Sequence, residues 1–165
     1  MANPVLQLLE IELLGENPDA YTSQFQWRMR MEAAASLPDA VSVSFVWVGS
    51  ASSSQYDQVL DDFEVGPLEQ GVTEFTLECD APQMELVPTE DVLGVTILLI
   101  SFQYRRQEFL RVGYYTQVAY FDAQLNQNPP PLPQRELLGR FVAMPQPAVT
   151  VTPIEWGSYG PQPAT

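Results

Sequence analysis

The chain has 165 residues, 45% of them hydrophobic, and a formal net charge of −14, so it is long enough for one domain with a substantial core and too short for two. It contains neither Lys nor His, which excludes imidazole general bases, the usual catalytic triads, Schiff-base chemistry and a phosphate-loop lysine. Because phosphate is bound through clustered basic residues, the acidic balance argues against direct nucleic-acid binding and favours a basic protein partner.

Cys79 is the only cysteine, so it has no internal disulfide partner and cannot build a metal cluster; no metal or cofactor is expected. Thr73, Phe75, Leu77 and Cys79 share one face of an alternating segment, which predicts a buried thiol in a reducing compartment. The N-terminus lacks the features of a signal peptide, and no apolar run is long enough for a membrane span. We therefore expect an intracellular protein that does not contact a membrane.

The first third of the chain predicts three strands. Residues 5–14 are rich in apolar side chains and end at the turn-forming cluster 15–19. Residues 25–31 alternate cleanly, and residues 41–48 follow after a break at 37–39. The predicted core positions are Phe25, Trp27, Met29, Met31, Val41, Val43, Phe45 and Trp47. The second face of 41–48 is also partly apolar, at Val46 and Val48.

A small polar loop, 49–54, precedes a segment 56–65 that carries Asp57, Asp61 and Asp62. Asp57 and Asp61 are expected on one face of it, where a carboxylate pair can in principle perform acid/base work on a sugar. Solvation of an exposed strand is the simpler interpretation. Another half-buried strand, 72–79, is followed by an irregular link, 80–91, whose prolines do not fit inside a central strand.

The stretch 94–115 predicts a hairpin with strands 95–104 and 108–115 around a turn at 105–107. Both faces of its first strand are apolar, because alternation places Val95, Ile97 and Leu99 on one side. The other side carries Leu98, Ile100, Phe102 and Tyr104. A sheet needs only one such face for its own core, so a partner is expected to cover the second.

The remaining chain predicts one short helical turn at 122–126, an extended Pro-rich connector at 128–133 and a final strand at 149–156. Several short strands with almost no helical periodicity predict an all-β fold, an immunoglobulin-like antiparallel β-sandwich. We expect a single domain over residues 1–156 and a short flexible tail over 157–165.

Several sequence runs resemble the anti-silencing function histone chaperones. The runs occur in the order of that family and are VGSASSSQYDQVLDDFEVGP (48–67), DAP (80–82), GVT (94–96), QEFLRVGYY (107–115) and NPP (128–130). The resemblance extends from about Phe25 to Trp156. It implies an immunoglobulin-like, non-enzymatic chaperone that binds a histone H3/H4 dimer and blocks its assembly into a tetramer. We expect it in the nucleus, with the cytoplasm as an alternative location.

In this family the long C-terminal helix of H3 lies on an apolar sheet face with a charged rim. The matching residues here are Val48, Asp57, Asp91, Val95, Ile97, Leu99, Arg111 and Tyr115. This agrees with the independent argument from alternation, which leaves Val95, Ile97 and Leu99 facing outward. The alternative for Ile97 is a position in the domain's own core.

The resemblance implies two further sites. The C-terminal segment of H4 adds as a strand to residues 148–152, with Pro147 and Val149 forming its pocket, unless the prolines around that edge leave it unoccupied. Basic peptides of other chromatin assembly factors dock on the far side of the sandwich, at Asp39, Val65 and Phe75. Here the chain departs from the family, because its acidic pair is matched by Asp39 followed by the neutral Ala40.

Two other functions are compatible with the composition. An immunoglobulin-like interaction module with a non-histone partner differs from a histone chaperone only in its partner. A carbohydrate-active enzyme requires the carboxylates of Asp57 and Asp61 to act together. A monomer is expected in each case.

Overall fold

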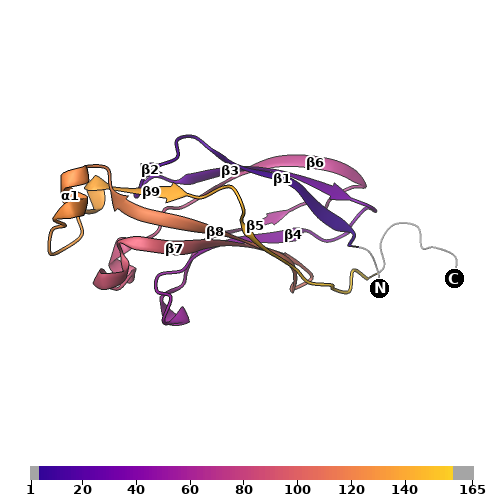
Figure 1. The fold of residues 1–165 in the computed structure, drawn as a ribbon. Helices are drawn as coiled ribbons and strands as arrows, with labels where there is room; N and C mark the ends of the chain where they lie inside the picture. The colour runs from indigo at the N-terminus through magenta and orange to yellow at the C-terminus, as the bar shows by residue number, and fades with distance from the viewer. Residues whose placement is uncertain (1–3, 158–165) are drawn as a thin grey trace, which may run out of the picture.

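In the computed structural model, which describes residues 4–157, two antiparallel sheets pack face to face (Figure 1). The smaller sheet has the strand order β1 (Leu6–Leu14), β3 (Phe25–Ala33) and β6 (Gly71–Cys79). The larger, seven-stranded sheet runs β2 (Asp19–Ala20), β9 (Leu138–Val142), β8 (Gln107–Tyr120), β7 (Gly94–Tyr104), β4 (Val41–Trp47) and β5 (Gln58–Val65), with β10 (Ala148–Val151) beside β8. This confirms the all-β, immunoglobulin-like sandwich.

Helical structure is confined to short connections. The helix α1 (Ala123–Gln127) is capped by the Asp122 carboxylate, which accepts a hydrogen bond from the Gln124 amide, close to the predicted turn. Single 3-10 turns occupy 54–56, 84–86, 89–91 and 135–137. None of the helices in residues 4–157 is both long and apolar enough to cross a membrane.

The core lies between the two sheets and follows the predicted alternation. The side chains of Trp27, Met29, Val41, Val43 and Phe45 are fully buried. The Trp27 ring stacks on Phe45 at 6.2 Å and on Tyr114 at 5.5 Å between ring centroids, so aromatic contacts join β3 to β4 and β8 across the sandwich. Cys79 is fully buried as predicted, and burial raises the pKa of its thiol to about 12, so it is un-ionised at neutral pH.

The two apolar faces of β7, the first strand of the central hairpin, are buried and exposed as predicted. Leu98, Ile100, Phe102 and Tyr104 have no exposed surface. Val95 is 67% exposed, and Ile97 and Leu99 are half-buried on the opposite face. The turn is tighter than predicted: Gln107 already belongs to β8, and Arg105 and Arg106 alone turn the chain at φ values of 50° and 65°, as in a two-residue hairpin turn.

The C-terminal region differs from the sequence expectation in two ways. The last strand ends at Val151 rather than at Trp156, because Pro153 interrupts the pairing and the Trp156 ring packs against Phe109 at 5.0 Å. The strand β9 was not predicted at all. The expected tail lies, apart from Gly157, outside the described residues.

Strand β9 escapes prediction because its core face carries a charge. Leu138 and Val142 face inward, and so does Arg140 between them, with 2% of its surface exposed. The Arg140 guanidinium lies 3.7 Å from the Phe25 ring centroid and donates a hydrogen bond to the Tyr21 carbonyl oxygen at 2.7 Å. Burial lowers the pKa of Arg140 to about 10, although the nearby Asp19 carboxylate opposes that shift.

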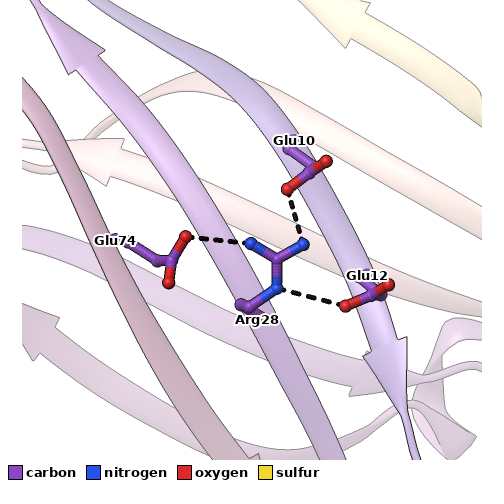
Figure 2. A network of polar contacts seen from close by, with 4 residues as sticks. All are labelled: Glu10, Glu12, Arg28 and Glu74. Atoms are coloured by element: carbon purple, nitrogen blue, oxygen red, sulfur yellow. Dashed lines mark hydrogen bonds and ion pairs between the residues drawn. The ribbon is translucent and has the colours of Figure 1, made fainter.

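The solvent-facing side of the smaller sheet is charged. Arg28 on β3 lies between Glu10 and Glu12 of β1 and Glu74 of β6, at distances of 2.6, 3.1 and 2.9 Å (Figure 2). The three carboxylates share one guanidinium, and the hydrogen bonds to Glu12 and Glu10 raise the pKa of Arg28 above its ordinary value. The network is exposed and contributes little to stability, but it leaves this face of the molecule acidic and free of a large apolar patch.

Candidate functional site

The outer face of the larger sheet carries side chains in rows that cross the strands. Pairing places Val46 of β4, Leu99 of β7 and Gly113 of β8 in one row. The next row holds Ile97 opposite Tyr115, with Val48 joined to Ile97 by a backbone hydrogen bond of 3.1 Å. We call Val46, Val48, Val59, Val95, Ile97, Leu99 and Tyr115 the outer-face patch.

Gly113 gives the outer-face patch a flat centre. A Cβ atom at this position would lie 3.2 Å from Leu99 Cδ2 and 3.4 Å from Ile97 Cγ2. The side chains of Ile97 and Leu99 therefore lie partly across the β8 backbone and present their sides to solvent. Val95, Val59 and Tyr115 around them are 67%, 63% and 53% exposed. A contiguous exposed apolar surface of this kind is typical of a protein-interaction site.

Charges mark the two ends of the outer-face patch. Asp57 follows the loop after β4, which folds back so closely that a Cβ at Gly49 would lie 2.4 Å from the Tyr56 carbonyl oxygen. Asp91 ends the 3-10 turn just before β7, so both exposed carboxylates lie at one end. Arg111 lies at the other end, opposite Ser101, and pairs with Glu108 at 3.1 Å. The apolar site therefore has carboxylates at one end and an arginine at the other.

The structure brings the apolar members of the predicted H3-binding set onto one face, with Arg111 at one end and Asp57 and Asp91 at the other, and places two further residues beside them. Val46 and Val59 belong to the outer-face patch but are absent from the sequence-based set. Val59 escapes prediction because a β-bulge at Leu60 reverses the alternation of β5. The same bulge makes the predicted Asp57 and Asp61 pair wrong: Asp57 precedes the strand, and Asp61 lies opposite the core residue Phe45.

An apolar groove of about 620 Å³ opens at one edge of the sandwich, between β1 on one side and β8 and β10 on the other. Leu6, Leu8 and Ile11 line one wall, and Tyr114 lies in the opposite wall. The predicted residues Pro147 and Val149 line the same groove. Among residues 4–157, β10 pairs only with β8, so its other edge is free for a further strand.

The third predicted set lies on the opposite edge of the sandwich. Val65 ends β5, Phe75 is in the middle of β6, and both side chains are half-buried at core-facing positions. Asp39 is exposed, and its carboxylate already accepts a hydrogen bond from Arg105 Nε at 2.6 Å. A basic ligand at this edge therefore competes with Arg105 for the carboxylate.

The described part of the chain was also searched for groups of side chains that could bind a metal. Its Asp, Glu and Cys side chains form no group of three or more that could hold a metal ion. A partner surface is the function that the exposed geometry supports.

The chain was compared with known proteins. A family model described as "ASF1 like histone chaperone" matches residues 3–157. The chain belongs to this family. ASF1-like histone chaperones are not enzymes, in agreement with the composition. The chain is 41% identical to Histone chaperone asf1b of Xenopus tropicalis over 151 residues, which are 92% of this chain and 75% of that protein.

Two other relatives of the ASF1-like family come from further organisms. Identity to Histone chaperone ASF1B of Homo sapiens is 38% over 151 residues, covering 92% of this chain and 74% of the human protein. Identity to Histone chaperone ASF1 of Coccidioides immitis is 39% over 152 residues, covering 92% of this chain and 56% of the fungal protein. The matched length includes the outer-face patch, the groove and the Asp39 edge, because the family model reaches residue 157.

Proposed function

We propose that the chain binds a histone H3/H4 dimer through the outer-face patch and thereby blocks the association of two dimers into a tetramer during nucleosome assembly and disassembly. The observation that carries the proposal is the exposed apolar face of β7 around Ile97, in a chain that belongs to the ASF1-like family. The opposite face of the same strand already fills the core, so the exposed face is available to a partner.

An amphipathic helix of H3 is the ligand that the shape of the patch favours. Its apolar side chains cover the rows of Ile97 and Leu99, and burial contributes roughly 25 cal/mol per Å² of apolar surface. Asp57 and Asp91 at one end and Arg111 at the other fix the direction of the helix, since a reversed helix brings like charges together. A helix held in this way is no longer free to pair with a second histone dimer.

The groove beside β10 supports a second contact with the same dimer. We assign it to the C-terminal segment of H4, which adds as a strand to the free edge of β10 and places an apolar side chain between Val149 and β1. Pairing of backbone groups supplies affinity here, and the groove supplies selectivity for an apolar residue.

The Asp39 edge is assigned to short basic peptides of other assembly factors. Val65 and Phe75 provide the apolar contact, and Asp39 provides a single carboxylate beside the neutral Ala40. With Arg105 already on Asp39, we expect weak binding at this edge. We further propose that residues 1–156 form a monomeric domain that acts in the nucleus. The net charge of −14 suits a strongly basic histone partner.

The decisive experiment mixes the chain with purified H3/H4 and measures the mass of the complex by light scattering. We expect one chaperone per H3/H4 dimer, and no complex with Ile97→Arg, because the substitution places an unpaired charge in the centre of the buried surface. Circular dichroism of the variant is the control for folding. Retained binding by a folded Ile97→Arg variant contradicts the site; absence of any complex with the natural chain contradicts the function and leaves a non-histone partner.

A further inference from the structure

A second exposed apolar surface lies on the outer face of the larger sheet, where β8 passes β9. Phe141 is opposite Gln117, and Gly139 is opposite Ala119. Phe121 follows the end of β8, and its amide is hydrogen-bonded to the Leu137 carbonyl oxygen. Phe121, Phe141 and Leu137 are 60%, 45% and 48% exposed. We call these three residues the β9 patch.

The Phe121 ring of this patch is held in place. A Cβ atom at Gly139 would lie 2.5 Å from Phe121 Cζ and 2.7 Å from Phe121 Cε2. The ring therefore lies against the β9 backbone in the space that any other residue at 139 would need, with its outer side open to solvent. An aromatic ring fixed in this way loses little conformational freedom when a partner covers it.

The β9 patch continues the outer-face patch across the sheet. The Ala143 amide donates to the Tyr115 carbonyl oxygen, so Phe141, two residues earlier, is the diagonal neighbour of Tyr115 on the same face. Diagonal neighbours in antiparallel sheets are about 7–8 Å apart. Val95 lies opposite Gln117, which in turn lies opposite Phe141. Strands β8 and β9 are direct neighbours, so no other strand of residues 4–157 lies between the two patches.

Charge identifies the kind of partner. Asp122, adjacent in sequence to Phe121, is exposed, as are Glu90 and Asp91 before β7. Glu136, adjacent to Leu137, is exposed too but pairs with Arg135 at 3.8 Å, so it contributes less negative charge than the other three. A basic partner suits this rim, whereas a second copy of a chain with a net charge of −14 is repelled. Aromatic side chains between acidic groups can contact both the apolar and the basic part of such a partner.

We propose that the β9 patch binds a second apolar segment of the same histone partner, next to the helix that covers Ile97. This inference rests on the proposed function and extends it, because it assigns a contact beyond the three sites described above. The partner segment presents aliphatic or aromatic side chains to Phe121 and Phe141 and basic side chains to the acidic rim.

The test is titration of H3/H4 with the variants Phe121→Ser, Phe141→Ser and Leu137→Ser. Each is expected to weaken binding about five- to tenfold, since each removes an exposed side chain that the complex buries. Val72→Ser is the matched control: Val72 is 51% exposed on β6 of the other sheet and should leave the affinity unchanged. Because Phe121 packs on Gly139, the urea midpoint of each variant is measured alongside.

Ile97→Arg separates this inference from the proposed function. Loss of binding with Ile97→Arg, together with unchanged affinity for all three Ser variants, overturns the β9 patch and leaves the central site intact. Unchanged binding with Ile97→Arg removes the proposed function and this inference with it. The mass of the free chain is measured as well. If the unsubstituted chain is a dimer and the Phe141→Ser variant is a monomer, the β9 patch is a self-association surface, and the inference is overturned.

Discussion

Ile97 and Ile100 are a matched pair for testing which face of β7 stabilises the domain and which face binds the partner. They are the same residue type on the same strand, but Ile100 has no exposed surface and Ile97 is half-buried on the outer face. Substitution by Ala removes three carbons, each worth about 0.8 kcal/mol when fully buried. Any change in intrinsic strand propensity is common to both variants and cancels in the comparison.

At Ile100 the transfer loss is about 2.4 kcal/mol, and the cavity left in the closed core brings the total to roughly 4 kcal/mol. At Ile97 only about half of the transfer term applies, and no closed cavity forms, so the free energy of unfolding should fall by about 1 kcal/mol. The other half of the Ile97 surface is buried only in the complex. Its loss should weaken histone binding about tenfold, equivalent to ~1.4 kcal/mol.

Urea denaturation followed by tryptophan fluorescence measures the stability, because Trp27, Trp47 and Trp156 are all buried. Titration with H3/H4, at concentrations where each variant is folded, measures the affinity. The expected pattern is reciprocal: Ile100→Ala loses stability and keeps its affinity, whereas Ile97→Ala keeps most of its stability and loses affinity. A destabilisation by Ile97→Ala as large as that by Ile100→Ala would refute the division of faces.

Two further predictions concern the edges of the sandwich. Val149→Asp should weaken binding of dimers with complete H4 about tenfold but leave the affinity for dimers lacking the H4 C-terminal segment unchanged; equal weakening in both titrations contradicts the groove assignment. At the other edge, Arg105→Gln should strengthen binding of an Arg-rich peptide a few-fold by freeing the Asp39 carboxylate, and Asp39→Asn should abolish it, as measured by fluorescence anisotropy. Peptide binding that ignores both substitutions argues against this edge.

The sequence predicts the elements that consist of uninterrupted alternation. Trp27, Phe45 and Ile100 are each part of an apolar series with period two, and all are fully buried. The prediction fails at β9, because Arg140 occupies a core position and is compensated there by the Phe25 ring and the Tyr21 carbonyl oxygen. Those partners are more than 100 residues away in sequence, so no local sequence pattern predicts them.

The candidate site shows the same limit. Alternation alone identifies Val95, Ile97 and Leu99 as a surplus apolar face, but Val59 requires the bulge at Leu60, and Phe141 requires the pairing of β9 with β8. The sequence shows that Asp39 carries a negative charge, but only the fold shows that Arg105 forms an ion pair with it.

The sequence by itself thus determined the core side chains of the strands with uninterrupted alternation, the absence of Lys and His chemistry, and the acidity that favours a basic partner, because these properties depend on residue identity and local period. The tertiary structure decided which surplus apolar residues meet on one face, how far that face extends from β5 to β9, and which charges lie at its ends. Those properties depend on strand order and register, which long-range pairing fixes.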